Sequence, residues 1–499
     1  MVPESATKYI SVPPFRRRVN IPVEMRQIAA FKPRRSFAGP IACVLLLVTV
    51  WSIHAAQRPL EWSGHGPLAD IPEDTANDFP APRPQDDIDL ADPEAPFIGW
   101  PLARMCAEAE PDQVEGLVFV CDNNSGGVGN IRNYIQTCLR YALEAGATGI
   151  TIPRIRRRDT DDLANLWTDY RPFSYMFDEH HFRNAWAAHC PHVRVYDDVT
   201  DVRIMEINGS EIEVEVELVT PKDFGDRDGS HPWDMNRHAH RFGDAFRAWL
   251  WRAGADRPPP SAERPRAIRF HWGVLWDWQV WYDGPEFATT FGHLLKFDER
   301  LLRLGNAALA GMRRIAREEV NKGEGAKDGD GDASFVGIHL RTESDAGNAW
   351  PTFEEQLAVF QEQGLRGEAN FRATYLATGN TTEAQRFAAE VDTETGGAMK
   401  VVSKHDLLSG DDLEELRALT FDQQGIVDAV VLLTADFFVG TMPSSFSVYV
   451  AMRRHLRTGG LYTRPYKAGS GAGDGLSYVG GHYDRYWENW LFMWDGMWP

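Results

Sequence analysis

The sequence predicts an α/β fold that follows a single N-terminal transmembrane helix, and three observations support this. Short apolar runs rich in β-forming residues alternate with helical stretches, a pattern typical of open sheets covered by helices. Roughly 400 residues follow the N-terminal region, which is enough for two domains of ordinary size. One apolar stretch near the N-terminus has the length needed to cross a membrane.

The N-terminus has a basic tail, 1–36, and then an apolar run, 37–56. The tail holds eight Lys or Arg against two Glu, and the run has no acid or base except His54. Roughly 20 such residues span a bilayer as a helix, and the basic side stays cytoplasmic. The tail is too long for an ordinary cleaved signal, so we expect a signal anchor rather than cleavage after Ala55-Ala56. This predicts a single-pass type II protein of the Golgi or endoplasmic reticulum membrane, with its main part in the lumen.

An acidic, Pro-rich segment follows the apolar run. Residues 57–98 contain ten acids, two Arg and eight Pro without apolar periodicity. Such a segment buries too little surface to offset its ordering entropy, so we expect a stalk over 57–112. The formal charge of −20, reached despite the basic tail, disfavours nucleic acid as a partner, because phosphate binding needs a basic face.

The cysteines indicate disulfides rather than a metal or redox site. An even set in an oxidising compartment predicts two disulfides, with three possible pairings that the sequence leaves open. No Cys-x-x-Cys pair occurs. Asn208-Gly-Ser210 is a candidate glycosylation acceptor. The five cysteines are Cys43 in the apolar run and Cys106, Cys121, Cys138 and Cys190 beyond it.

A Gly-rich turn joins a predicted strand, 116–121, to a predicted helix, 131–145. Its sequence is Asp-Asn-Asn-Ser-Gly-Gly-Val-Gly-Asn, over 122–130. Backbone N–H groups at the positive end of a helix suit a phosphate. The dinucleotide fingerprint is incomplete, because Arg132 stands where its third Gly belongs, and the Gly-Lys-Ser/Thr of phosphate loops is absent. A tight turn without a ligand therefore stays an alternative.

The turn and the segments after it resemble a known family. Gly-Gly-Val-Gly-Asn at 126–130 resembles the Gly-x-Phe-Gly-Asn-Gln loop of animal protein O-fucosyltransferases. Asn-Ile-Arg at 130–132 resembles the Asn-Gln-x-Arg of their plant relatives, although one residue shorter, and 177–182 is similar to the plant Phe-Asp-x-x-His-Phe segment. Between them a predicted strand, 149–153, runs into an Arg-rich stretch, 154–158, for which a solvated basic face is the alternative.

The middle of the chain is less informative. Alternating apolar and Glu residues predict a half-exposed strand within 202–219, and 295–315 predicts a helix. The aromatic run 271–282 is interpreted as packed core or an interdomain face rather than a sugar-stacking surface, and the Trp-rich C-terminal end likewise as packing.

The Gly- and Asp-rich stretch 321–333 predicts a linker. Its Asp-Gly-Asp-Gly-Asp at 328–332 fails the EF-hand pattern, and an Asp-x-Asp manganese site is the alternative.

The second half of the sequence contains motifs that indicate function more specifically than the Gly-rich turn of the first half. A buried-type strand, 334–340, ends in Arg341-Thr-Glu343-Ser-Asp345, and ligands of open α/β sheets bind at such strand ends. The fork of an Arg side chain suits a diphosphate. From His339 to Asp345 the sequence closely resembles the His-Leu-Arg-x-Glu-x-Asp motif of the plant O-fucosyltransferase-like family.

A third motif follows near the C-terminal end of that half. Residues 428–440 predict a helix and a strand, and Thr-Met-Pro-Ser-Ser-Phe-Ser at 441–447 turns into a helix, 448–456. This block resembles the Ala-Asp-x-Phe-Ile-Gly…Ser-Ser-Phe-Ser/Thr segment of animal protein O-fucosyltransferases, including an Asp at the position of Asp428. N-capping by a Ser is the alternative for the turn.

The resemblance covers roughly 115–190 and 335–455, in matching order, and implies a GT-B-like fold of two Rossmann-like domains that face a cleft. We expect an N-terminal Rossmann-like domain over 113–320 and a C-terminal GDP-sugar-binding domain over 321–499. The implied activity is transfer of fucose from GDP-fucose to an acceptor hydroxyl on a protein or glycan, without a metal or other cofactor. A lumenal NAD(P)-type oxidoreductase and a non-catalytic glycan-binding membrane protein are the alternatives.

The resemblance also implies site residues. Arg341 and Asn130 are the predicted catalytic residues, since Arg341 supplies a cation for the leaving phosphate. Glu343 and Asp345 are candidates for a general base or for support of Arg341, because the Glu that one animal branch has in its Gly-rich loop is missing near Gly127. The predicted donor-binding residues are Gly126, Gly127, Gly129, Asn130, Arg132, His339, Arg341, Asp428, Ser444, Ser445 and Phe446.

Overall fold

A computed structural model of the chain describes residues 88–205, 210–224, 239–252, 258–322, 334–347, 350–365, 371–458 and 474–499. The predicted tail, the apolar run 37–56, Asn208 and the Asp-rich stretch 328–332 lie outside these residues. No helix of the described part is long and apolar enough to cross a membrane. All of the described residues belong to one compact unit.

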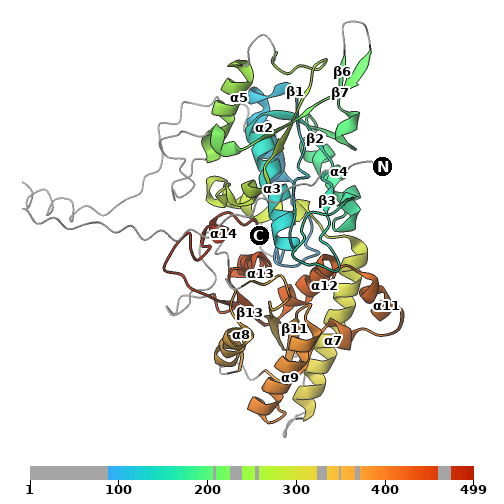
Figure 1. Ribbon diagram of the computed structural model, residues 1–499, viewed down its shortest axis with the longest axis vertical. Coiled ribbons are helices and arrows are strands. Elements are labelled where there is room, and N and C mark those ends of the chain that lie inside the picture. The colour runs from blue at the N-terminus through green and yellow to red at the C-terminus, as the bar shows by residue number, and fades with distance from the viewer. Residues whose placement is uncertain are drawn as a thin grey trace, which may run out of the picture. The chain divides into compact units, whose positions relative to one another are not determined.

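The first half of the described chain forms a five-stranded sheet whose neighbouring strands are all parallel, in the order β5-β2-β1-β9-β8. Helix α3 (Val128–Glu144) connects β1 to β2 (Figure 1). Its residues are buried along almost its whole length. The strands are β1 (Val114–Phe119), β2 (Ala147–Thr151), β5 (Arg194–Tyr196), β8 (Val216–Val219) and β9 (Arg266–Phe270).

The second half repeats this design with the parallel order β12-β11-β10-β13-β14. The strands are β10 (Val336–His339), β11 (Ala373–Ala377), β12 (Lys400–Val402), β13 (Phe437–Thr441) and β14 (Ser477–Gly480). The helices that accompany them are α8 (Phe353–Phe360), α9 (Thr381–Thr395), α10 (Lys404–Leu407), α11 (Gly410–Ala418), α12 (Phe421–Thr434) and α13 (Ser445–His455). Two parallel sheets with connecting helices confirm the predicted α/β class.

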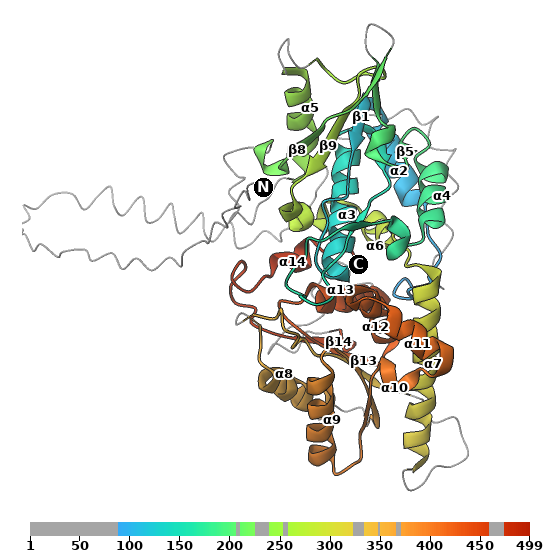
Figure 2. The same ribbon diagram turned by 45° about the vertical axis from the view of Figure 1, so that its right-hand side comes forward.

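The two halves meet through helices. The α3 helix contacts both α12 and α13 of the second half (Figure 2). Helix α7 (Glu299–Lys322), which follows the first sheet in sequence, packs along α12, and a Cβ at Gly305 would lie only 2.6 Å from Val430 Cβ. At the other end of the chain, the backbone of Trp498 accepts a hydrogen bond from the α3 side chain Arg132. The helix that follows the first sheet in sequence therefore packs on the second half, and the C-terminal residues that follow the second sheet pack on the first half.

Two segments differ from the sequence-based predictions. Residues 202–219 do not form one strand: β6 (Arg203–Met205) pairs antiparallel with β7 (Glu211–Glu213), and β8 then joins the first sheet. The alternation continues across the break because each piece has the same period of two, and the sequence between β6 and β7 contains Asn-Gly, a hairpin signal. The end of the predicted stalk, 57–112, is also ordered: α2 (Trp100–Ala109) buries Leu102 and Cys106.

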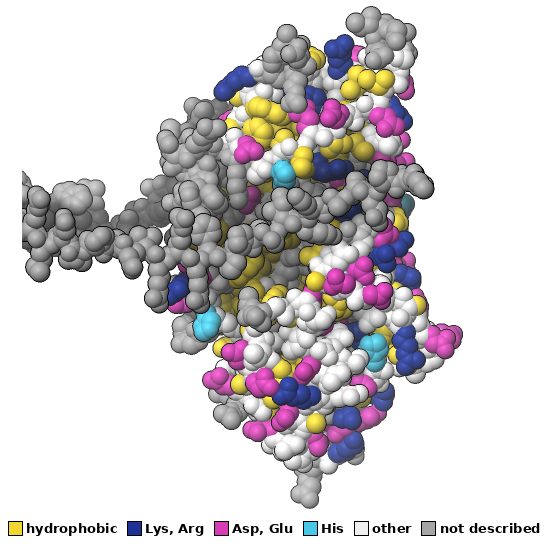
Figure 3. Space-filling view, viewed as in Figure 1, with side chains coloured by type: hydrophobic (Ala, Val, Ile, Leu, Met, Phe, Trp, Pro, Cys, Tyr) yellow, Lys and Arg dark blue, Asp and Glu magenta, His cyan; other side chains and the backbone are white. Residues whose placement is uncertain are grey.

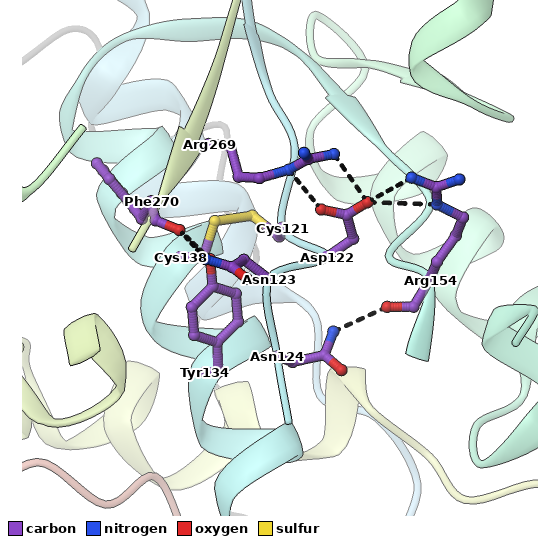
Figure 4. Close-up of a disulfide and its surroundings, with 9 residues drawn as sticks. All are labelled: Cys121, Asp122, Asn123, Asn124, Tyr134, Cys138, Arg154, Arg269 and Phe270. Atoms are coloured by element: carbon purple, nitrogen blue, oxygen red, sulfur yellow. Dashed lines mark hydrogen bonds and ion pairs between the residues drawn. A yellow bond between two sulfur atoms is a disulfide. The ribbon is translucent and has the colours of Figure 1, made fainter. Parts of the chain in front are cut away.

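The two predicted disulfides are present, and the structure gives their pairing. Cys106 joins Cys190 with a Cα–Cα distance of 5.6 Å, which fixes α2 to the end of α4. Cys121 joins Cys138 at 5.7 Å and ties the end of β1 to α3, as Figure 4 shows. The remaining elements include β3 (Ile155–Arg156), β4 (Tyr170–Arg171), α4 (Glu179–His189), α5 (Phe242–Arg252), α6 (Pro285–Thr290) and α14 (Phe492–Asp495).

The aromatic runs serve mainly as core, as predicted. Trp278 is fully buried, and its ring lies edge-on to Tyr141 at a centroid distance of 5.0 Å. Trp494 and Trp498 at the C-terminal end are buried as well, whereas Trp490 is 44% exposed. On the face shown in Figure 3, acidic and basic side chains are interspersed over the surface that the structure describes, without a continuous basic patch.

Candidate functional site

A cavity of about 320 Å³ lies where the carboxyl ends of β10, β11 and β13 face the start of α3. This is the edge at which open parallel sheets bind ligands. The cavity brings together most of the site residues predicted from the sequence. Those in its wall are Gly126, Gly127, Asn130, His339, Arg341, Glu343, Asp345, Asp428, Ser444, Ser445 and Phe446.

The Gly-rich turn enters the cavity with its backbone. Gly126 has φ +98°, in the left-handed region that favours glycine, and Gly127 is the N-cap residue of α3. Gly129 is not in the cavity wall. A Cβ there would lie 2.7 Å from the Ser445 carbonyl carbon and oxygen, so glycine lets α3 approach the start of α13. The starts of two helices thus converge on one cavity.

Arg132 lies elsewhere, in contrast to the prediction. It is 1% exposed, and its guanidinium donates to the carbonyl oxygens of Gly292, Trp498 and Pro499 at 2.8–3.0 Å. Arg132 follows Asn130 by two residues, which turns it about 200° around the helix and away from the cavity. It joins α3 to the C-terminal end of the chain instead of facing a donor.

Arg341 is held by two carboxylates. Its Nη1 donates to Glu343 Oε2 at 2.5 Å and its Nη2 to Asp345 Oδ1 at 2.7 Å. The second oxygen of Glu343 accepts from the Gly379 amide at 2.7 Å. Burial would raise the pKa of Glu343, but the charge of Arg341 and the Gly379 hydrogen bond outweigh it and lower that pKa. The two carboxylates thereby hold Arg341 at the cavity and balance its positive charge. The Arg341 side chain is 11% exposed.

Arg158 also enters the cavity, and sequence reasoning missed it. It is 7% exposed, its Nη1 donates to Asp345 Oδ2 at 2.6 Å, and its Nε lies 3.5 Å from Asp422 Oδ1. The other arginines of the run serve structural contacts: Arg154 pairs with Asp122 at 2.9 Å (Figure 4), and Arg156 covers the Tyr170 ring. Arg158 follows β3, which pairs with β4 in a separate antiparallel ribbon, so the strand-end rule for parallel sheets that singled out Arg341 does not reach it.

A buried ion pair forms a deeper part of the wall. Asp428 Oδ2 accepts from Lys404 Nζ at 2.8 Å, and Asp428 Oδ1 accepts from the Tyr375 hydroxyl at 2.6 Å. Lys404 is 1% exposed and lines the cavity beside Asp428. It follows the end of β12 and is a second site residue that the sequence analysis did not identify.

His339 and the turn before α13 complete this side. His339 Nδ1 lies 2.8 Å from Ser447 Oγ, and the Phe446 ring lies edge-on to the imidazole at 4.8 Å. Burial lowers the pKa of His339 to about 4, so the ring is neutral at neutral pH. The Ser444 hydroxyl accepts from the Ser447 amide, so the N-capping interpretation is confirmed for Ser444. Ser445 remains in the cavity wall.

A second cavity, of about 650 Å³, adjoins the first and shares four wall residues with it. It lies entirely against the second half, between α8 and the ends of β13 and β14. Within the part of the chain that the structure describes, no group of three or more His, Cys, Asp or Glu is arranged to hold a metal ion. The shared residues are His339, Trp350, Pro443 and Trp490.

Residues 117–457 match the family model described as GDP-fucose protein O-fucosyltransferase. The chain belongs to this family. The membership confirms the resemblance found in the sequence and places the chain among the glycosyltransferases. The cavity residues from Gly126 to Phe446 all lie within the matched range.

Solved structures of fucosyltransferases are also similar to this chain. POFUT1 in complex with GDP is 12% identical with a TM-score of 0.34, over 74% of this chain and 98% of that chain. A mutant of Arabidopsis thaliana FUT1 in complex with GDP is 12% identical with a TM-score of 0.32, over 70% and 71%. NodZ from Bradyrhizobium is 13% identical with a TM-score of 0.33, over 68% and 92%. No curated protein matches the sequence.

Proposed function

We propose that this protein is a membrane-anchored O-fucosyltransferase-like enzyme that transfers fucose from GDP-fucose to an acceptor hydroxyl on a protein or glycan. The observation that carries the proposal is that Arg341, the Gly-rich turn and the start of α13 line one cavity in a member of this family. In the proposed GT-B arrangement the two α/β halves hold the donor between them.

The donor's diphosphate fits the part of the cavity where α3 and α13 begin. Both helices begin there with the positive ends of their dipoles; the first turn of α3 has no side-chain cap, and in α13 the Ser447 amide is capped by Ser444. Ser445 and Asn130 add polar side chains at the same place. In this proposal the nucleoside contacts Asp428, His339 and Phe446, deeper in the second half.

Arg341 stabilises the leaving group. As the bond between the sugar C1 and the β-phosphate oxygen breaks, its electron pair stays on GDP, and negative charge grows there. For its guanidinium to grip the phosphate, Arg341 exchanges one or both carboxylate partners for phosphate oxygens. Asp345 then keeps its contact with Arg158, and Glu343 keeps its contact with Gly379. This supports a positioning role for both carboxylates, whose lowered pKa values make them poor proton acceptors.

The proposed enzyme uses no metal, because the arginines at the cavity provide the positive charge. Its proposed place is the Golgi or endoplasmic reticulum membrane, in single-pass type II orientation. The basic tail and the apolar run in the sequence support this, as do two disulfides, which persist in oxidising compartments. Protease added to intact vesicles should remove only the tail, and digestion of the main part would contradict the orientation.

Titration of the full-length protein in detergent with GDP, GDP-fucose and NAD tests the proposed function. We expect saturable binding of GDP and GDP-fucose and none of NAD, measured by calorimetry. Binding of NAD instead would favour the oxidoreductase alternative. Failure to bind any of the three would favour a non-catalytic, glycan-binding protein.

A further inference from the structure

Asp422 is a buried carboxylate in the cavity wall to which the proposed mechanism gives no role so far. It is the second residue of α12 and is 3% exposed. Its Oδ1 accepts no hydrogen bond from any described residue, and the ion pair to Arg158 Nε spans 3.5 Å. Burial of a carboxylate oxygen without a hydrogen bond is costly, which makes a polar substrate group a natural partner.

The other carboxylates in this wall are occupied. Glu343 accepts from Arg341 with one oxygen and from Gly379 with the other. Asp345 divides its oxygens between Arg341 and Arg158. Asp428 does the same between Tyr375 and Lys404. Asp422 thus differs from these neighbours in that no described residue donates a hydrogen bond to its carboxylate, so a substrate group can bind there without displacing one.

Gly127 keeps the space beside Asp422 open. A Cβ at residue 127 would lie 3.9 Å from Asp422 Oδ1 and 3.8 Å from Arg158 Nη2, which is ordinary van der Waals contact. A longer side chain at that position would therefore extend into the region beside the carboxylate. Glycine at residue 127 therefore keeps a longer side chain out of the part of the cavity wall that Asp422 and Arg158 share.

The electrostatic surroundings suit a proton acceptor. Burial raises the pKa of Asp422 to about 6, although the charge of Arg158 opposes this. Asp345 raises the pKa further and Arg341 lowers it, while Tyr175 from the first half faces the same carboxylate. A carboxylate with such a pKa is ionised at neutral pH and binds a proton more readily than Glu343 and Asp345, whose pKa values are lowered.

We propose that Asp422 is the general base of the transfer reaction, which rests on the proposed function. As the acceptor oxygen forms its bond to the sugar C1 and GDP departs with the electron pair of the old bond, the hydroxyl proton passes to the Asp422 carboxylate. The proton then leaves to solvent. With water as the acceptor, the same transfer gives free fucose and GDP.

The simpler role for Asp422 is structural. An acid in the first turn of a helix interacts favourably with the helix dipole, and its loss would lower stability without affecting chemistry. Asp411, in the first turn of α11, is exposed and outside the cavity wall, so it provides a matched control for this effect.

The test compares Asp422→Asn and Asp411→Asn with the parent, in full-length protein. GDP release from GDP-fucose, with water as acceptor, is measured from pH 5 to 8, together with GDP affinity and melting temperature. We expect Asp422→Asn to lower kcat by about 10²–10⁴-fold, the usual contribution of general base catalysis, with GDP affinity unchanged. The acidic limb of the parent's pH profile, with an apparent pKa near 6, should vanish in this variant.

Two outcomes would overturn the assignment of Asp422 as the base, and a third would refute the proposed function. Weaker GDP binding by Asp422→Asn with a preserved pH profile would make Asp422 a nucleotide contact. Unchanged turnover, or turnover that falls only with melting temperature, would make it structural. Failure of the parent itself to bind GDP-fucose would instead refute the proposed function and is recognised separately, because it does not depend on any variant.

Discussion

The two sides of the cavity contribute different chemistry. The first half provides the Gly-rich turn, the large apolar side chains Leu166, Trp272 and Trp276, and one charged group, Arg158. The second half provides the dense charge of the site, which lies at strand ends and helix starts. The second half therefore supplies nearly all of the charge at the cavity, and the first half supplies a glycine-rich backbone and apolar side chains. The charged residues of the second half are Arg341, Glu343, Asp345, Lys404, Asp422 and Asp428.

Arg158 is the charged residue that the first half contributes to the cavity, and its removal should strongly affect both the stability of the protein and its binding of GDP. Arg158→Gln leaves Asp345 and Asp422 close together with less compensation, and breaking a buried ion pair costs about 3–5 kcal/mol. We expect a lower free energy of unfolding and weaker GDP binding. Denaturant unfolding and calorimetry measure both.

The neighbouring residue is the control for this prediction. Arg157 pairs with Asp169 at the surface, where ion pairs contribute little because water and salt screen them. Arg157→Gln should therefore behave as the parent. If the two substitutions lowered the free energy of unfolding and GDP binding equally, the buried ion pairs of Arg158 would contribute no more than a surface ion pair does.

The backbone contribution of the first half is tested at Gly129. A Cβ there would meet the Ser445 backbone at 2.7 Å, so Gly129→Ala forces α3 and α13 apart. Overpacking of this kind costs about 1–3 kcal/mol, and we expect a lower melting temperature and a higher Kd for GDP. Gly273→Ala is the control, since a Cβ at Gly273 has no atom within 4 Å. A Gly129→Ala protein with parental GDP affinity would separate the helix approach from donor binding.

The smallest effect is expected from chelation. If the arginines supply the positive charge at the diphosphate, GDP-fucose turnover should persist in excess EDTA. The triple substitution of Asp328, Asp330 and Asp332 by Ala should likewise leave turnover close to parental. Loss of turnover on chelation, restored by manganese, would contradict the metal-free mechanism.

Sequence reasoning found the strands and most of the cavity because both depend on local pattern. Residues after strand ends, such as His339 and Arg341, lie at a shared edge once the strands are parallel. Arg158 was missed because its partner Asp345 lies 187 residues away and because it follows a strand of an antiparallel ribbon rather than of a parallel sheet. Arg132 was misplaced because a motif match does not specify which face of the helix a residue occupies.

The general base illustrates the same limit. Glu343 and Asp345 were candidates by position, but their lowered pKa values come from contacts with Arg341 and Arg158 that only folding creates. Asp422 has no motif around it, and its character follows from burial beside the Gly-rich turn. Burial and distant partners, which set a pKa, are not encoded in local spacing.

The turnover of Arg341→Ala tests the central claim most directly. Arg341→Ala breaks ion pairs to two buried carboxylates, so the variant should melt below the parent, but Glu343 keeps its contact with Gly379 and Asp345 its contact with Arg158. Turnover is therefore compared at a low temperature at which both proteins are folded. We predict that GDP release from GDP-fucose falls by about 10²–10³-fold, as for loss of one oxyanion donor. Arg341→Lys should recover little, since it lacks the bidentate fork. A variant that melts early yet turns over GDP-fucose normally at low temperature would contradict the account and make Arg341 structural.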